Sequence, residues 1–223
     1  GLDWVDVTSA LKADPAKAAA LASNLSDWEN NASASHFRAI QAKVRTFVES
    51  GQLGIFANGY WGHSEYRLNP EANLMVLAHY LEALQWQRDI IKAHALIGAK
   101  NPHPQTFLVG GMSLPIDPNS QNALNAGTIA ALSTYAEKAL AFVEKVYIPD
   151  LLAVASFYKD WAEHGSFRNF LSCGEHPDGQ GKYYFPAGVI LNKDLSKVYP
   201  MDHKKFAEYI SNSWYSYSGG DDK

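Results

Sequence analysis

Apolar residues recur at helical spacing along most of the chain, and the longest such stretch predicts a helix over residues 71–97. Pro70-Glu71 opens this helix and Gly98 ends it. One face is continuously apolar, because residues three, four or seven positions apart are large and hydrophobic: Leu74, Leu77, Leu81, Leu84 and Ile91. Such a wide stripe predicts a helix that is buried among other helices.

Two shorter helices are predicted before it. Residues 2–29 are rich in alanine, and Asp14-Pro15 supplies an N-cap followed by proline at the first helical position. A second helix begins at His36, keeps its apolar residues on one face and ends at Gly51. The loop over residues 54–62 carries phenylalanine, tyrosine and tryptophan, so we expect it to pack against a neighbouring element.

The helical period stops after residue 98. Residues 100–118 are rich in proline and predict a constrained loop that leads into a brief strand at 106–109. The helical period returns over 128–148, is interrupted at Pro149, and continues as a shorter or irregular helix through Trp161.

The last third of the chain has a different character. Residues 165–200 are rich in glycine, proline and turn residues, and the short apolar pieces 187–191 and 198–199 predict a small β element. The fold class is therefore mainly α, with a small β portion in the last third. We divide the chain into a helical core segment, 1–164, and a mixed α+β segment, 165–223, which together form one continuous piece of a larger domain.

Composition narrows the class of protein. The chain has 223 residues, of which 47% are hydrophobic and 19% charged, as expected for a globular domain with a sizeable core. The 19 basic and 23 acidic residues give a net charge of −4, and the basic residues are scattered, so no nucleic-acid-binding or anionic-membrane surface is predicted. No stretch is apolar enough to predict a membrane span.

The two ends of the chain carry their own expectation. It starts at Gly1 without methionine and closes on an acidic, glycine-containing tail, residues 219–223. We interpret the chain as a piece of a longer protein. The alternative is a tag remnant on a complete domain.

The ionisable residues offer few catalytic patterns. Cys173 is the single cysteine, so the chain forms no internal disulfide or thiolate cluster, and we expect a buried, inert thiol. On the long helix, His79, Glu82 and His94 could face one direction and bind a metal ion. Their order differs from the Glu-x-x-His motifs of di-iron bundles and occurs once. Histidines bonded to their surroundings are the favoured interpretation, and the metal site is the alternative.

The least ordinary stretch follows the long helix. Pro102 and Pro104 flank His103 and restrict the local backbone, which fixes where the imidazole points. A helix C-terminus also favours a cationic side chain such as Lys100. The residues by themselves favour a rigid structural connection, with a functional His103 as the alternative.

Several motifs carry a resemblance to a known family. The central one is Lys100–Gln105, followed by Val109–Met112. Further motifs occur in the family's order: Leu2–Val7, Phe47–Gly54, Asn58–Gly62, Pro70–Met75, His79–Leu84, Ile148–Asp150, Tyr158-Lys159 and Ser213–Tyr215. Over nearly its whole length the chain resembles the central part of nickel–iron hydrogenase large subunits, most closely the membrane-bound uptake group. The resemblance implies long buried helices of that fold.

The resemblance also implies an activity. Such subunits hold a Ni–Fe centre with CO and cyanide ligands through four cysteines in two Cys-x-x-Cys motifs, and the enzyme oxidises H2 reversibly. This chain contains neither motif. We therefore expect it to supply scaffold and a small-subunit interface, to hold no catalytic or metal-ligating residue, and to be inactive alone.

Three residues are carried over from the resemblance. His103 is expected beside the iron–sulfur cluster of the small subunit that lies nearest the active site, where it would bond a cluster ligand, and Lys100 and Asn101 would support that interface. Two departures are visible: Ala99 stands where many relatives have glycine, and Ser113 where many uptake enzymes have cysteine.

The expected partners are the remainder of the large subunit, the iron–sulfur small subunit and, through it, a membrane cytochrome, on the periplasmic side of the cytoplasmic membrane. No nucleic acid is expected. Two alternatives stay open: a non-catalytic excised or assembly module of the same fold, and the unrelated helical metalloprotein considered above. A piece of such a core would expose apolar surface, so we expect this chain to associate with other chains.

Overall fold

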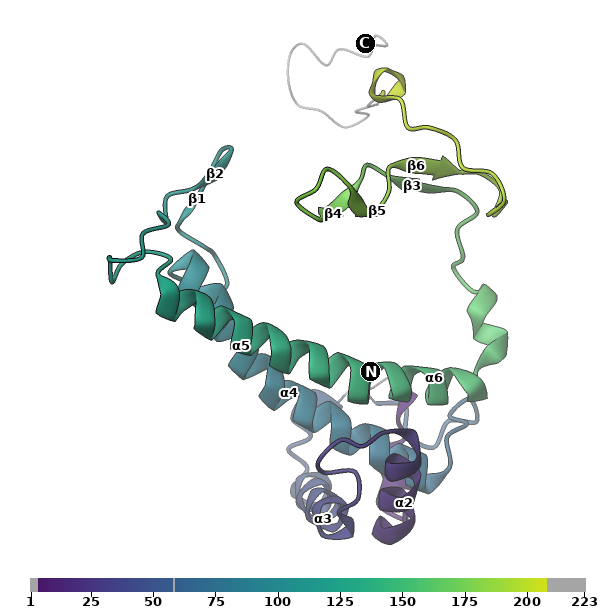
Figure 1. Ribbon diagram of the computed structural model, residues 1–223. Coiled ribbons are helices and arrows are strands. Elements are labelled where there is room, and N and C mark those ends of the chain that lie inside the picture. Colours follow the sequence, from purple (N-terminus) through teal and green to yellow (C-terminus); the bar gives the residue numbers. More distant parts are fainter. Residues whose placement is uncertain (1–3, 58, 208–223) are drawn as a thin grey trace, which may run out of the picture. The chain divides into compact units, whose positions relative to one another are not determined.

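The computed structural model describes residues 4–57 and 59–207, which form two compact units divided between Lys159 and Asp160 (Figure 1). Each unit is described by itself, and the border expected between residues 164 and 165 stays a prediction. The motif Ser213–Tyr215, the acidic tail and the first three residues lie outside the described residues.

The first unit is helical, as predicted for the fold class. Its elements are α1 (Val7–Ala10), α2 (Pro15–Leu25), α3 (Ala34–Ser50), η2 (Gly54–Phe56), α4 (Pro70–Gly98), α5 (Ala126–Phe142), the π-helical turn η3 (Val143–Tyr147) and α6 (Ile148–Phe157). The short 3-10 helix η4 (Lys159–Glu163) crosses the division between the units.

Three predicted helix borders are confirmed by their caps, whereas α3 and α5 each begin two residues before the predicted start. The side chain of Asp14 accepts a hydrogen bond from the backbone N–H of Ala16, with Pro15 at the first position of α2. Gly51 ends α3 in the left-handed region, at φ 68°. Helix α4 begins at Pro70 behind Asn69, whose side chain accepts from the N–H of Ala72 at 2.8 Å.

The core forms where α1 and α2 pack against α4, with α3 beside them. Its largest fully buried apolar side chains are Val5, Val7, Phe37, Val44, Leu74, Met75 and Leu77. Phe56 is buried in this cluster and Trp61 packs against it, which confirms the expectation for the aromatic loop. One polar contact joins the layers at the centre, since the backbone N–H of Asp6 donates to Oδ1 of Asn73 on α4 at 2.9 Å.

Helix α4 is less buried than its apolar stripe predicts. Apart from Gly98 at its end, its buried residues lie within 72–79, and Ile91 and Leu96 in the second half are exposed. The second half packs against α5 (Figure 1). There Trp86 stacks on Phe142 with ring centroids 5.1 Å apart. The prediction of burial among helices is therefore correct only for the first half within this chain.

The helix was expected to be interrupted at Pro149. In the structure the irregular turn, η3, lies just before the proline. The backbone N–H of Ile148 bonds to the carbonyl of Val143, five residues back, so the chain widens into a π-helical turn. Proline lacks the N–H that would bond Lys145, four residues back. The carbonyl of Lys145 instead accepts a hydrogen bond from Oγ of Ser26, which lies after α2. The helix can then resume as α6.

The strands are short and pair locally. In the first unit β1 (Phe107–Leu108) pairs antiparallel with β2 (Gly111–Met112), which confirms the strand expected at 106–109 and adds a partner that was not anticipated. In the second unit β3 (Phe170–Ser172) pairs with β6 (Gly188–Ile190), and β4 (Glu175–Pro177) pairs with β5 (Tyr183–Phe185) between them along the chain.

The β element expected from residues 187–191 and 198–199 is confirmed. Val189 and Tyr199 form an antiparallel bridge with backbone hydrogen bonds of 2.9 and 2.8 Å. A single 3-10 turn, η5 (His203–Lys205), follows it.

Large apolar side chains are exposed on both units. On α5, η3 and α6 they are Ile129, Leu140, Tyr147, Ile148, Leu151, Leu152 and Phe157, and on the second unit they include Phe167, Tyr184, Phe185 and Leu195. The exposed apolar surface expected for a piece of a larger core is therefore present. Association with other chains stays a prediction.

Candidate functional site

The candidate site is the loop that leaves the end of α4. Its backbone folds back on the helix, because the N–H of Gln105 donates to the carbonyl of Gly98 at 2.9 Å. Oγ1 of Thr106 donates to the carbonyl of Ile97 at 2.7 Å. Two of the carbonyls left open at the helix end are thereby satisfied by the loop itself. The Asn101–Pro102 peptide bond is cis.

Gly98 is the point of closest approach between helix and loop. A Cβ atom added there would lie 2.9 Å from Cβ of Pro104, closer than carbon atoms pack. Glycine therefore allows the proline ring to rest directly on the last turn of α4. This contact fixes the position of the residues on either side of the proline.

A side-chain hydrogen bond supports the first half of the loop. Nδ1 of His94, in the last turns of α4, lies 2.7 Å from Oδ1 of Asn101. His94 was a candidate metal ligand in the sequence, and this contact gives it a different role. Sequence reasoning missed both His94 and Gly98 as supports of the loop. The available signal was their spacing: His94 lies four residues before Gly98, and Gly98 lies three residues before Asn101.

The three residues carried over from the resemblance lie together at the surface. Lys100, Asn101 and His103 are all exposed, within one turn of chain after α4. The loop continues into the β1–β2 hairpin, whose Phe107 and Leu108 are also exposed. Ser113 closes the hairpin, because its N–H donates to the carbonyl of Thr106 at 2.7 Å. The structure thus presents one continuous surface formed by residues 100–112.

Ala99 occupies the left-handed region at φ 60°, directly after α4. An L-residue other than glycine is disfavoured there by roughly 1 kcal/mol. We therefore expect Ala99→Gly to raise the free energy of unfolding by about 0.5 to 1 kcal/mol, measured by chemical denaturation.

Gly51 offers the reciprocal control for this change. It occupies the same position after α3, at φ 68°, with no atom within 4 Å of an added Cβ. Gly51→Ala should lower the free energy of unfolding by a similar amount. Equal effects of one sign at both positions would show that backbone strain does not control stability there.

The alternative metal site is not assembled. His79 bonds to Asp150 and Asn31, at 2.8 and 2.9 Å. Oε1 of Glu82 accepts from Trp28 and Asn30, both at 3.0 Å. Within residues 4–57 and 59–207, no three histidine, cysteine, aspartate or glutamate side chains form a group that could hold a metal ion. The interpretation that these histidines are bonded to their surroundings is confirmed.

The expectation for Cys173 was wrong. Its side chain is exposed, in the connection between β3 and β4. The reason is that each small sheet of the second unit has two strands, and among residues 160–207 no second layer covers the thiol.

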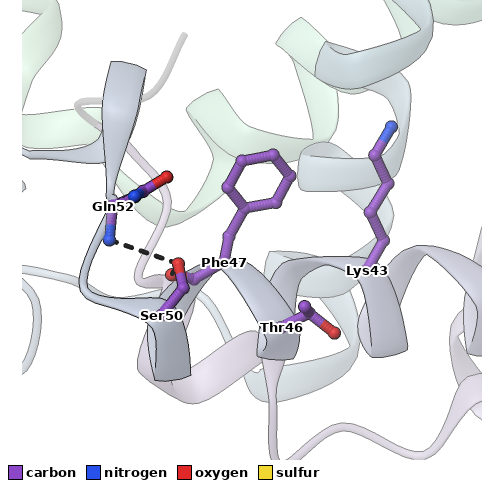
Figure 2. Close-up of a pocket in the computed structure, with 5 residues that line it drawn as sticks. All are labelled: Lys43, Thr46, Phe47, Ser50 and Gln52. Atoms are coloured by element: carbon purple, nitrogen blue, oxygen red, sulfur yellow. Dashed lines mark hydrogen bonds between the residues drawn. The ribbon is translucent and has the colours of Figure 1, made fainter.

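A hollow on the surface of α3 carries none of the candidate residues. Figure 2 shows its lining, which is formed by Lys43, Thr46, Phe47, Ser50 and Gln52. The N–H of Gln52 donates to Oγ of Ser50 at 3.2 Å, as part of the helix end. This set contains no acid, histidine or cysteine, and it does not form a catalytic or metal site.

Comparison with known proteins identifies the family. The sequence profile described as "Nickel-dependent hydrogenase" matches residues 1–223, the whole chain. This chain belongs to that family. The membership agrees with the resemblance carried by the loop and hairpin motifs.

Curated relatives with substantial sequence identity belong to the same family. The "Uptake hydrogenase large subunit" of Rhizobium leguminosarum bv. viciae is 45% identical over 97% of this chain. The "Hydrogenase-1 large chain" of Escherichia coli (strain K12) is 43% identical over 97% of it. The chain spans 38% of the length of each of these relatives. It therefore corresponds to part of a hydrogenase large subunit.

Solved structures agree with the fold. The Ni-Fe-Se hydrogenase of Desulfovibrio vulgaris Hildenborough in the as-isolated oxidized state matches with a TM-score of 0.54 and 28% identity. The match covers 70% of this chain and 31% of that one. In the part of this family member that the structure describes, every helix is too short or too polar to cross a membrane.

The family implies a nickel-containing centre, and the described residues do not fit one. Nickel and iron in such a centre need a set of soft donors such as thiolates. The chain has one cysteine, Cys173, and its described part brings together no group of three potential ligands. Within residues 4–57 and 59–207, the structure therefore assembles no ligand set for that centre.

Proposed function

We propose that this chain is the central segment of the large subunit of an enzyme that oxidises H2 reversibly to two protons and two electrons. Its own part is to supply helical scaffold and the contact to an iron–sulfur small subunit. The proposal is supported by the family profile over the whole chain and by relatives named as hydrogenase large subunits.

One observation carries the proposed interface: a histidine is held at the surface on a loop that is bonded to the end of a long helix. Gly98, Pro104 and the His94–Asn101 hydrogen bond restrict this loop, whereas His103 itself is exposed. A restrained backbone with an exposed imidazole is suited to bond a group on another chain, because little conformational freedom is lost on contact. We assign that group to a sulfur ligand of the small subunit's nearest iron–sulfur cluster.

Lys100 and Asn101 extend the same surface. Lys100 is exposed at the negative end of the α4 dipole, and Asn101 uses its side-chain oxygen toward His94. The same hydrogen bond fixes the orientation of the Asn101 side-chain amide. We propose that both residues support the interface around His103.

The cofactor of the proposed enzyme is a Ni–Fe centre with CO and cyanide ligands, held by cysteines in parts of the subunit beyond this segment. The centre would supply the chemistry of H2. The present residues supply packing and contact, and we propose that this segment is inactive by itself.

The relatives also support a place for the enzyme. Two of them are named uptake hydrogenase large subunits. We propose an uptake enzyme bound at the periplasmic side of the cytoplasmic membrane through its small subunit, which would pass electrons to a membrane cytochrome.

The test is His103→Ala in the assembled enzyme. We expect the rate of H2 oxidation to fall about ten-fold, the typical effect of losing a hydrogen bond beside a metal site. The midpoint potential of the nearest cluster should shift to a lower value, because a donated hydrogen bond to sulfur stabilises the reduced cluster. Activity assays and redox titration of the cluster measure both effects.

His164→Ala is the matched control, since His164 is exposed and lies outside the loop. It should leave both the rate and the potential unchanged. Nickel and iron contents should be the same in all three proteins. A His103→Ala enzyme with an unmoved cluster spectrum and potential would remove the proposed role of His103.

A further inference from the structure

The β1–β2 hairpin, which follows the candidate loop, exposes apolar side chains on both of its faces (Figure 1). Phe107 and Leu108 on β1 are 58% and 61% exposed, Val109 in the turn is fully exposed, and Met112 on β2 is 37% exposed. Phe107 pairs with Met112 across the two strands, so these two side chains lie on one face, whereas Leu108 belongs to the other. Two strands of this length cannot bury either face between them.

The same stretch of sequence is depleted of charge. Residues 101–116 contain no lysine, arginine, aspartate or glutamate, although such residues make up 19% of the chain. The core of a protein–protein interface has this composition, with few charged residues and an excess of phenylalanine and methionine. An apolar hairpin left in water would instead be a site of aggregation. The composition therefore indicates a surface that another chain covers.

Hydrogen bonds hold the base of the hairpin to the end of α4. Oγ1 of Thr106 donates to the carbonyl of Ile97 at 2.7 Å. The carbonyl of Thr106 accepts from the N–H and from Oγ of Ser113, at 2.7 and 3.1 Å. The apolar side chains thus extend from a base that is fixed to a long helix. Little conformational freedom would be lost when a partner covers them.

The hairpin lies within reach of any chain that contacts His103. Phe107 follows His103 by four residues, and an extended chain covers at most about 3.6 Å per residue, so their Cα atoms lie no more than about 14 Å apart. An interface of ordinary size buries about 800 Å² on each partner, which corresponds to a disc of roughly 16 Å radius. A subunit centred on His103 would therefore cover Phe107 as well.

We propose that Phe107, Leu108 and Met112 form the apolar anchor by which this chain binds the iron–sulfur small subunit, beside the contact made by His103. This inference rests on the function proposed above and adds what an imidazole does not supply, namely the burial of apolar area that drives association. The matching surface on the small subunit is an apolar pocket without charged side chains, because a charge buried against Phe107 without a partner would weaken binding. The competing occupant is the remainder of the large subunit.

The first measurement compares hydrogen exchange of the complete large subunit when it is free and when it is bound to the small subunit. We expect the amides of residues 107–112 to exchange at least about ten-fold more slowly in the complex, because the covered hairpin loses access to water. Residues 44–50 of α3 should exchange at equal rates in both states. Hairpin amides that exchange equally in both states would overturn the proposal, as would an equal slowing of both segments. This measurement needs no variant to fold.

The second measurement is the dissociation constant of the two subunits, from calorimetric titration of the small subunit with variants of the complete large subunit. Phe107→Ala should raise this constant at least about ten-fold, as the loss of an interface anchor does. Phe107→Leu keeps most of the apolar side chain and should stay within about three-fold of the wild type. Phe47→Ala is the matched control, because Phe47 on α3 is a phenylalanine with 43% exposure. It should leave the constant unchanged.

These outcomes separate the anchor from the role proposed for His103. A Phe107→Ala subunit that binds with the wild-type dissociation constant would overturn the anchor, whatever the cluster potential of the His103→Ala enzyme. A weakened Phe107→Ala complex together with an unmoved potential in His103→Ala would remove the role of the histidine and support the anchor. If Phe107→Ala destabilises the free large subunit and leaves its affinity unchanged, the remainder of that subunit covers the hairpin and the anchor is wrong.

Discussion

Replacement of Asp6 by alanine is expected to lower the free energy of unfolding by about 3 kcal/mol. The carboxylate caps α1 and accepts hydrogen bonds from the N–H groups of Thr8, Ser9 and Gly62, at 2.9, 3.1 and 2.9 Å. It also accepts from Oγ1 of Thr8 at 2.6 Å. Alanine would leave these donors without an acceptor in a site where Asp6 is 8% exposed. Chemical denaturation followed by tryptophan fluorescence measures the loss.

The same residue predicts acid sensitivity. Burial by itself raises the pKa of Asp6, but the hydrogen bonds from Thr8, Gly62 and Ser9 outweigh it, so the pKa lies below its ordinary value of 3.8. A lowered pKa means that the ionised carboxylate stabilises the folded state above the unfolded pKa. This contribution is lost as pH falls through the folded pKa.

Two variants separate these effects. Asp6→Asn keeps the shape and cannot titrate, so its stability should fall less between about pH 4 and pH 2 than that of the wild type. Asp14→Ala removes an exposed N-cap with one hydrogen bond to the backbone of α2 and should lower stability by about 1 kcal/mol. An Asp6→Ala effect no larger than that of Asp14→Ala would show that the additional bonds of Asp6, including the one from Gly62, contribute nothing.

Gly98→Ala is expected to destabilise the end of α4 and to displace the loop that carries His103. The new methyl group would lie 2.9 Å from Cβ of Pro104, and neither the proline ring nor the helix backbone can yield freely. Overpacking of this kind destabilises by about 1 to 3 kcal/mol, which exceeds the gain in helix propensity of at most about 1 kcal/mol. We expect a net loss of about 1 to 2 kcal/mol.

The functional effect of Gly98→Ala follows from the proposed interface. If His103 moves, the assembled enzyme should oxidise H2 more slowly, with nickel and iron contents unchanged. Gly111→Ala is the control for stability alone, because the same methyl group meets no atom within 4 Å, although the residue belongs to the surface of residues 100–112. If the two variants had equal stability, or if Gly98→Ala left the activity at the wild-type level, the contact between Gly98 and Pro104 would not position the loop.

The helix borders were predictable because capping is local. Asp14-Pro15 and Gly51 each act on backbone groups within four residues, so their effect can be inferred from the sequence. The brief strand at 106–109 and the β element of the last third were predictable for a similar reason, since turn residues bound them closely.

Burial was harder to predict because it depends on what packs against each face. The apolar stripe of α4 is the same along its length, yet only its first half is buried by α1, α2 and α3. Cys173 was expected inside and is exposed, because hydrophobic character does not show how many layers a sheet will have.

The candidate site was partly visible in the sequence. His103 between two prolines and the family resemblance both pointed to the loop at residues 100–105. The supports of that loop were not visible, because the contact of Pro104 with Gly98 and the bond from His94 to Asn101 depend on how the chain turns after the helix.

The sequence by itself determined the family, the mainly helical class, the ends of the main helices and the absence of a thiolate ligand set. Only the tertiary structure decided which partners polar groups have across long stretches of sequence. Ser26 reaches the carbonyl of Lys145 across 119 positions, and His79 meets Asn31 and Asp150 across 48 and 71. The physical reason is that a hydrogen bond depends on distance in space, whereas sequence patterns report only on neighbours along the chain.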